Sequence, residues 1–280
     1  MPRKEGVFIM TEDEIHKLHQ LTLKIANEIK RICENNGIQY SLSGGTLLGA
    51  VRHRGFIPWD DDMDIDMTRE NYDRFINKCK TELGSEYILQ TWITDTEYHN
   101  GFAKILLKGT CAIEKRGKDT ICEKGIFVDI FPWDNIPHSQ WKRNIHNIHI
   151  QIFKNLLIAK HGAKIPENSK MFKKGIFIIL QFISRFMTHR YLVAHCEREL
   201  RKYPPGDMIT CAVGVLGYKS NTIPSSWHNH YLNLPFEDTT FSAIEKYDDL
   251  LKQSYGDYMT PPPLSKRRCH EYIKLDFGNY

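Results

Sequence analysis

The chain has 280 residues, of which 41% are hydrophobic and 26% charged, a balance typical of a soluble globular protein that excludes collagen-like, coiled-coil and disordered chains. Its 38 Lys and Arg and 34 Asp and Glu residues give a net charge of +4. That charge is too small to indicate nucleic-acid binding, but it suits an anionic small-molecule substrate or a membrane surface.

We expect neither an export signal nor a membrane span. The apolar patch near the N-terminus covers only residues 7–10, too few for the core of a signal peptide. The most apolar window is residues 175–183, whereas crossing a bilayer takes about 20 residues. This window predicts a buried helix segment, or alternatively an interfacial helix, because Lys173, Lys174 and Arg185 flank it.

The cysteines indicate the compartment. All seven are scattered along the chain without a C-x-x-C pair. Such a set favours free thiols in a reducing compartment over a disulfide framework or a zinc ribbon. We therefore predict a cytoplasmic protein, and peripheral association with the inner face of the cytoplasmic membrane stays open.

The first quarter of the chain alternates between helix and strand. Apolar residues recur every three or four positions over residues 11–35 and predict an amphipathic helix, with Thr11 and Glu14 as a capping box at its start. Residues 38–42 alternate as a strand does, and after a glycine break residues 46–53 predict a second helix.

The remaining elements divide the chain into two parts. A strand is predicted over 59–67, a helix over 69–83, and strands over 87–92, 102–107 and 125–131. Long, weakly amphipathic helices follow within residues 141–200, and a loop-rich last stretch contains a helix over 242–255. The fold class is therefore α/β (α+β), with a mixed-sheet core over residues 1–135 and a mostly helical, loop-rich part over residues 136–280.

The most informative segment is the run of aspartates within residues 59–67. In a strand, Asp60, Asp62, Asp64 and Asp66 would share one face at about 7 Å spacing, with apolar residues on the other face. Several carboxylates on one face repel one another, and a divalent cation with oxygen ligands, Mg²⁺ or Mn²⁺, relieves that repulsion. The alternative is an acidic edge strand that faces solvent.

Two neighbouring features favour the metal. The sequence Ser43-Gly44-Gly45-Thr46 joins a strand to a helix, where glycine amides can approach a phosphate, although the alternative is a plain tight turn. Asp129 stands alone in an apolar strand, where a metal or a role as base would explain it, although it could also cap the following turn. Provided that Asp129 lies beside the aspartate run, these are the parts of a two-metal phosphoryl or nucleotidyl transferase.

Specific motifs across the chain resemble the LicD family, bacterial phosphocholine transferases related to the fukutin-type ribitol-phosphate transferases. The resemblance extends from about residue 12 to residue 272, and its most specific block is residues 43–64. The matching segments are 37–40, 43–53, 55–64, 72–75, 102–105, 125–132, 236–237, 255–259, 261–262, Cys33 and His270.

The resemblance implies a nucleotidyltransferase-like fold and a phosphotransferase activity. The enzyme would move a phospho-alcohol, typically phosphocholine, from a CDP-activated donor such as CDP-choline to a sugar hydroxyl, releasing CMP. The acceptor would be a surface glycan (teichoic acid, lipopolysaccharide or capsule) or its lipid-linked oligosaccharide. The metal ligands would be Asp62, Asp64 and Asp129. The family usually has a small residue where Asp66 stands, which puts Asp66 in doubt as a ligand, and residues 137–230, which match least, are expected to hold acceptor specificity.

Further roles follow as hypotheses. The Gly44 and Gly45 amides and Arg52 would hold phosphate oxygens, and Asp129 would also take the acceptor's proton. Lys104 would neutralise phosphate, although it and Arg52 could equally be surface cations.

Aromatic and histidine residues are weaker candidates. Trp59 and Trp133 are candidates for contacting a quaternary ammonium group, with core packing the favoured alternative. His146 and His149 share a helical face, but without a third ligand nearby they are expected to be structural.

Two other functions remain open at this point. One is a glycosyltransferase that holds a sugar nucleotide through an Asp-x-Asp motif, and the other is a non-catalytic glycan-binding relative. The presence of Asp62, Asp64 and Asp129 argues against the second.

Overall fold

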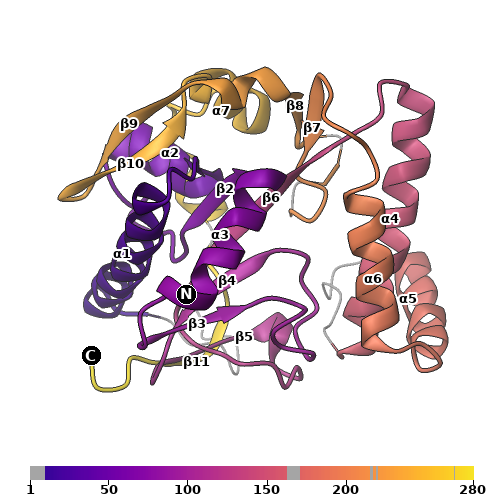
Figure 1. Cartoon of the computed structure of the whole chain (residues 1–280). Coiled ribbons are helices and arrows are strands. Elements are labelled where there is room, and N and C mark those ends of the chain that lie inside the picture. The colour runs from indigo at the N-terminus through magenta and orange to yellow at the C-terminus, as the bar shows by residue number, and fades with distance from the viewer. Residues whose placement is uncertain (1–9, 163–170, 215–216, 219, 268) are drawn as a thin grey trace.

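A sheet of seven strands lies at the centre of the chain in the computed structural model (Figure 1). The structure describes residues 10–162, 171–214, 217–218, 220–267 and 269–280. The main strand order is β1-β2-β6-β4-β3, with β7 beside β6 and β8 beside β7. These strands are β1 (Ser41–Leu42), β2 (Asp64–Thr68), β3 (Tyr87–Gln90), β4 (Ala103–Leu107), β6 (Phe127–Asn135), β7 (Met208–Thr210) and β8 (Thr222–Pro224).

Strands β2 and β6 are parallel, and the other described pairs are antiparallel. Two small sheets accompany the main one. Strand β5 (Cys111–Glu114) pairs with β11 (Tyr272–Asp276), and β9 (Tyr231–Phe236) pairs with β10 (Thr239–Ile244). The segment after residue 136 therefore contributes strands to the main sheet and to the strand pairs around it.

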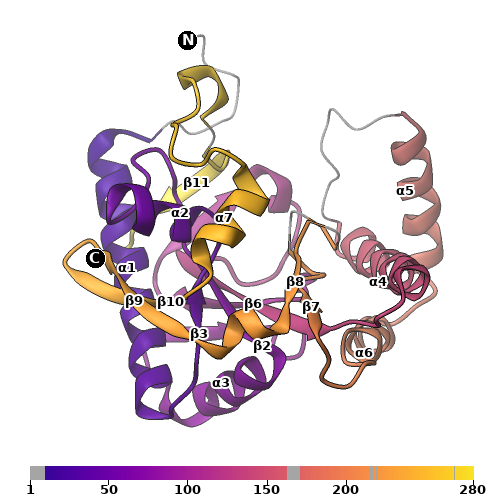
Figure 2. The same cartoon turned by 90° about the horizontal axis from the view of Figure 1, so that it is seen from above.

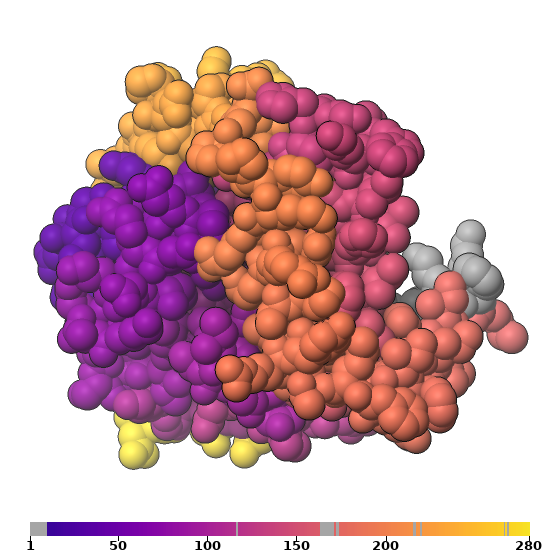
Figure 3. Space-filling view, turned by 45° about the vertical axis from the view of Figure 1, so that its right-hand side comes forward, coloured from indigo at the N-terminus to yellow at the C-terminus, as the bar shows by residue number. Residues whose placement is uncertain are grey.

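The helices form two groups. Helices α1 (Glu12–Asn35) and α3 (Arg69–Glu82) pack on the main sheet, while α2 (Gly44–His53) lies between β2 and α7 (Tyr247–Tyr255). Helices α4 (Gln140–Lys160), α5 (Met171–Ser184) and α6 (His189–Leu200) stand together beside the sheet, as the view from above shows (Figure 2). They form one side of the molecule in the space-filling view (Figure 3). Short 3₁₀ helices cover Lys115–Gly117, Ser225–Asn229 and Leu264–Lys266.

The core lies mainly between α1, α3 and the sheet. From Leu18 on, every third or fourth residue of α1 is buried, and Ile25, Ile29 and Ile32 are fully buried, as the helical period predicts. Strand β2 contributes Ile65 and Met67, both fully buried. Because side chains alternate along a strand, Asp64 and Asp66 then point to the opposite face, and this alternation positions the site.

The α/β fold class and most expected elements are confirmed. The Thr11–Glu14 capping box is present, and all seven cysteines are free. The helix predicted over 46–53 begins two residues earlier, at Gly44, and the division at residue 135 stays a prediction. The expectation about residues 7–10 falls mainly outside the described residues.

Three expectations were wrong. Residues 59–63 form an irregular loop and not a strand, because a loop lets the run of polar side chains turn in different directions. Residues 242–244 belong to β10 and not to a helix, since Phe241 and Ala243 alternate inward in a hairpin. The window 175–183 is helical but mostly exposed, because only one face of α5 packs on α4.

No single described helix is both long enough and apolar enough to cross a bilayer. One pair of described helix segments, Lys174–Ser184 and His189–Leu200, meets the length and composition criteria together, with a bend of 117° between them.

Candidate active site

Two aspartates from neighbouring parallel strands form the centre of the site. Asp64 begins β2 and is the register partner of Asp129 in β6. The amide of Asp129 also donates to the carbonyl of Met63 at 3.0 Å, which fixes the strands at this point. Lys104 of β4 lies opposite Asp129 on the other side, so the three side chains meet across three adjacent strands. The expectation that Asp129 lies beside the aspartate run is confirmed.

The irregular loop before β2 adds two more carboxylates. Burial raises the pKa of the Asp64 carboxyl well above its usual value, and the charges of Asp62, Asp129, Asp66 and Asp60 raise it further, so these carboxylates lie close enough to Asp64 to repel it. We call Asp60, Asp62, Asp64 and Asp129 the carboxylate cluster.

The remaining aspartate of this loop, Asp61, pairs with a distant histidine. Its carboxylate accepts hydrogen bonds from the His270 amide and ring, at 3.0 and 3.1 Å. Burial would lower the pKa of His270, but the hydrogen bond to Asp61 and the charge of Asp62 outweigh burial and raise it to about 10. The Asp61, Asp62 and His270 ligand atoms lie within 4.8 Å of one another. These three side chains could together hold a metal ion, and Asp61 and His270 also form an ion pair that ties the loop to the segment before β11.

The glycine turn lies directly against the cluster. Ser43 is the N-cap of α2, and Gly44 and Gly45 form its first turn. A Cβ on Gly44 would lie 2.9 Å from Asp64 Oδ2, and a Cβ on Gly45 would collide with Asp60 Oδ2. Gly44 also has a φ of +52°. Only glycine permits this approach, which places the amides of a helix N-terminus beside the carboxylates.

Thr46 ties the helix to the strand. Its hydroxyl oxygen accepts a hydrogen bond from the amide of Asp64 at 2.8 Å. Helix α2 is thereby fixed to β2 at the residue that carries the central carboxylate.

The cluster carries more negative charge than its surroundings balance. Burial, followed by neighbouring carboxylates, raises the pKa of Asp60 to about 7 and that of Asp64 well above its usual value. Burial raises the pKa of Asp129 to about 6 despite the opposing effect of Lys104, whose Nζ lies 2.8 Å from Asp129 Oδ1. Among the described residues that oxygen has no hydrogen-bond donor in suitable geometry.

These observations test whether the residues fit a divalent cation. Buried, mutually repelling carboxylate oxygens match the hard-oxygen preference of Mg²⁺ and Mn²⁺, and a cation among them would relieve the repulsion. The donor set therefore fits such an ion.

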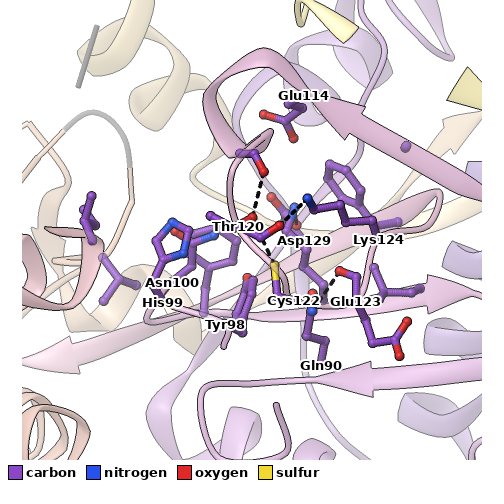
Figure 4. A pocket seen from close by; sticks show the side chains of 18 of the residues that line it. Gln90, Tyr98, His99, Asn100, Glu114, Thr120, Cys122, Glu123, Lys124 and Asp129 are labelled. Carbon is purple, nitrogen blue, oxygen red and sulfur yellow. Dashed lines mark hydrogen bonds and ion pairs between the residues drawn. The ribbon is translucent and has the colours of Figure 1, made fainter. Parts of the chain in front are cut away.

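Two cavities meet this cluster. The larger, of about 450 Å³, is lined by Asp62, Asp129, Lys104 and, across from them, residues of α4. Figure 4 shows the carboxylate of Asp129 at this cavity with Tyr98 and His99 on its wall. The smaller, of about 200 Å³, is lined by Ser43, Gly44, Gly45, Asp64, Asp66 and Trp133. Substrate groups placed in both cavities would meet at the carboxylates.

Asp66 differs from the cluster in its partners. It lines the smaller cavity, and burial raises its pKa to about 7, opposed by the side chains of Ser43 and Trp133. Trp133 is itself buried and lies on the same wall. Both residues are therefore beside the site, although neither faces the larger cavity.

Two predicted residues lie away from both cavities. Arg52 is in the last turn of α2, at the opposite end from the glycines, and donates to the Tyr258 carbonyl at 2.7 Å. The ring of Trp59 is covered by the guanidinium of Arg267, 4.0 Å from the ring centroid. Neither residue lines either cavity as the structure describes them.

The histidine pair of α4 has structural contacts, as expected. His146 is buried, and its two ring nitrogens contact the Tyr218 hydroxyl at 2.9 Å and the Glu199 carbonyl at 2.7 Å. His149 Nδ1 lies 3.7 Å from Glu199 Oε2.

Sequence reasoning missed the pairing of Asp61 with His270 and the lysines of the larger cavity. Lys124 and Lys154 line that cavity, and each donates to a backbone carbonyl, that of Thr120 and that of Val213. A possible signal for Lys154 was its position among apolar residues of a helix. The Asp61–His270 pair has no local signal, because 209 positions separate its members.

Comparisons with known proteins place this geometry in context. The family model described as "LicD/FKTN/FKRP, nucleotidyltransferase domain" matches residues 37–168. The lipopolysaccharide cholinephosphotransferase LicD of Haemophilus influenzae is 31% identical over 257 residues, which cover 89% of this chain and 92% of that protein. The mouse ribitol 5-phosphate transferase FKRP is 38% identical over 61 residues, 22% of this chain and 12% of that protein. The carboxylate cluster lies within the matched domain, and His270 lies outside it.

Proposed function

The chain belongs to the LicD/FKTN/FKRP nucleotidyltransferase family, and from this membership we propose that it is a phosphotransferase that transfers a phospho-alcohol to a glycan. The transferred phospho-alcohol that we favour is phosphocholine, because the relative that matches along 89% of the chain is named a cholinephosphotransferase. The proposed donor is a CDP-alcohol, with CDP-choline favoured, and the proposed acceptor is a sugar hydroxyl of lipopolysaccharide, teichoic acid or capsule.

One observation carries the proposal. Asp64 and Asp129 are register partners in parallel strands, and Asp64 lies beneath the glycine turn at the N-terminus of α2. Carboxylates and helix amides thus face one space, which suits a ligand that is an anion accompanied by a cation. A divalent cation held by Asp62, Asp64 and Asp129 would neutralise charge on the donor diphosphate and on the leaving group.

The chain's own groups have separate roles in the reaction. The amides of Gly44 and Gly45 hold oxygens of the donor diphosphate. The acceptor hydroxyl oxygen forms a bond to the phosphorus of the phospho-alcohol, and the bond from that phosphorus to the bridging oxygen breaks. CMP leaves with the bridging oxygen and its electron pair. Asp129, which faces the larger cavity, takes the hydroxyl proton, and the ammonium of Lys104 next to it balances the charge of the phosphate.

The choice of phospho-alcohol and donor is tested by turnover. The protein would be incubated with Mg²⁺, a lipid-linked glycan acceptor and CDP-choline, CDP-ribitol, CDP-ethanolamine or CDP-glycerol, with release of CMP measured for each. We expect acceptor-dependent release of CMP, fastest with CDP-choline.

Variants link the turnover to the cluster. Asp62→Asn and Asp64→Asn should abolish release of CMP, while Asp238→Asn, at an exposed turn residue between β9 and β10, should leave it unchanged. Turnover of a sugar nucleotide in place of every CDP-alcohol would replace the proposal with a glycosyltransferase. Failure to bind Mg²⁺ or Mn²⁺ in calorimetry, together with no turnover, would indicate a glycan-binding protein.

A further inference from the structure

Helix α5 exposes large apolar side chains to solvent. Ile178, Ile179 and Phe182 are 65%, 59% and 59% exposed, and Phe186 just beyond the helix is 78% exposed. Only a narrow face, including Phe177, packs inward against α4. A helix that is apolar on nearly all sides is normally enclosed, so this face requires a partner.

A stripe on helix α4 continues this surface. Trp141, Ile148 and Ile152 lie on one side of the helix and are 70%, 55% and 43% exposed. Ala159 falls on the same side by the helical period and lines a small hollow together with Gln181 of α5. Helix α5 therefore packs at one end of the stripe. We call the exposed apolar residues of α4 and α5, with Phe186, the apolar ridge.

The segment that carries the ridge is strongly basic. Residues 135–196 contain ten Lys and Arg and a single glutamate, whereas the rest of the chain holds 28 basic and 33 acidic residues. The positive net charge of the protein thus comes entirely from this segment. Of its cations, Lys142, Lys174, Arg185 and Arg190 are exposed, and none has a carboxylate partner among the described residues.

We propose that the apolar ridge docks on the surface of an anionic lipid bilayer, with its apolar side chains in the headgroup–acyl boundary and the surrounding cations on lipid phosphates. An apolar helix face bordered by lysine and arginine is the pattern of interfacial helices. Unpaired cations around an apolar patch would repel a basic partner, including a second copy of this segment, but they are attracted by anionic lipid.

The ridge also adjoins the larger cavity. Gln151, Asn155 and Ile158 of α4 line that cavity, and they lie about a quarter turn from the exposed stripe. A docked chain therefore holds the cavity beside the bilayer, where the glycan of a lipid-linked acceptor would project. This last step rests on the proposed function, whereas the docking itself does not.

Co-sedimentation of the full chain with vesicles tests the docking. We expect binding to vesicles of phosphatidylglycerol and phosphatidylcholine, weak binding to phosphatidylcholine alone, and loss of binding as salt rises. Ile179→Ser with Phe182→Ser, and separately Arg185→Glu with Arg190→Glu, should each weaken binding by about tenfold or more.

Matched controls make the result specific. Ile93→Ser replaces an isoleucine that is 70% exposed elsewhere, and Lys246→Glu with Lys274→Glu reverses two exposed charges outside the basic segment. These variants should bind as the wild type does, and circular dichroism should show that all variants are folded.

Three results would overturn the proposal. The first is binding to vesicles that is absent or does not depend on anionic lipid, and the second is equal weakening of binding by the ridge and control variants. The third is a dimer in sedimentation velocity that Ile179→Ser with Phe182→Ser dissociates, without vesicle binding, which would assign the ridge to a second copy. Neither readout uses turnover, so an inactive but vesicle-binding protein would refute only the proposed function.

Discussion

The carboxylate cluster and the apolar ridge are opposite departures from ordinary packing. In the cluster, charged groups are buried close to one another, whereas on the ridge, apolar groups that would stabilise a core are exposed. Both arrangements are unfavourable for the chain alone in water. The comparison teaches that, under the two proposals, each region is explained by a different partner: a cation and phosphates for the cluster, and lipid for the ridge.

The strongest test of the comparison is the removal of one cluster charge. Asp64→Asn should reduce phosphotransfer by at least about 10³-fold, because a central oxygen ligand and its charge are lost. Without metal, its melting temperature should be unchanged or higher, since one crowded buried acid is gone. Added Mg²⁺ should raise the melting temperature of the wild type and not that of the variant.

Asp238→Asn is the control for this measurement. Retained phosphotransfer in both Asp64→Asn and Asp62→Asn would contradict the assignment of the cluster.

The next test concerns the strand that links the two regions. Asp134, near the end of β6 and 1% exposed, pairs with Arg69 of α3 at 2.6 and 2.8 Å. Arg69→Met should lower the free energy of unfolding by about 3–5 kcal/mol, because it leaves a buried carboxylate without its partner. Urea unfolding measures the change.

A more exposed pair on the same helix provides the control. Lys78 lies 3.3 Å from Glu82, and Lys78→Met should cost less than about 1 kcal/mol. Equal losses of unfolding free energy in the two variants would show that the buried Arg69–Asp134 pair contributes no more to stability than the Lys78–Glu82 pair.

Two glycines sharpen the comparison further. Gly45→Ala should lower stability by about 1–3 kcal/mol and phosphotransfer by about tenfold or more, because its Cβ would collide with Asp60. Gly175 lies in α5, and a methyl group added there would meet no described atom within 4 Å, so Gly175→Ala should be neutral or stabilise by up to about 1 kcal/mol. Thermal unfolding measures the change in stability of both variants, and only the variant at the crowded glycine turn should lose stability.

The smallest expected effect is on acid stability. Burial lowers the pKa of His228, which packs beside Trp133, to about 4. In the unfolded chain the pKa of His228 is at its usual value of about 6.5. The stabilising contribution of the neutral side chain is therefore fully present above that pH and is lost as the pH drops toward 4.

Between pH 7 and pH 5 the free energy of unfolding should fall for the wild type, and in His228→Gln that fall should be smaller by about 1–2 kcal/mol. Urea unfolding at the two pH values checks this, and an unchanged loss would show that His228 is protonated in the folded protein.

Local patterns were sufficient for the centre of the site. Strand alternation placed Asp64 and Asp66 on one face, and the isolated charge of Asp129 in an apolar strand indicated that it lay near other polar groups. The helix after the glycines was expected over residues 46–53 from its apolar residues Leu47, Leu48 and Val51, and α2 begins two residues earlier, at Gly44. The catalytic roles of these residues stay predictions.

Long-range contacts and exposure could not be predicted in the same way. Arg52 and Trp59 are close to the cluster in sequence, but Tyr258 and Arg267, both near the end of the chain, hold them elsewhere. Hydropathy identified α5 as apolar but does not say whether a second element covers it, and here only one face is covered.

The pairing of Asp61 with His270 has a consequence for synthesis. The two residues are 209 positions apart, so the ribosome produces the aspartate long before its partner. Until His270 emerges, the loop that carries Asp60 and Asp62 lacks this contact, so the carboxylate cluster is held on one side only. A chain cut short just before residue 270 would keep most of the main sheet and lose the contact that closes the loop.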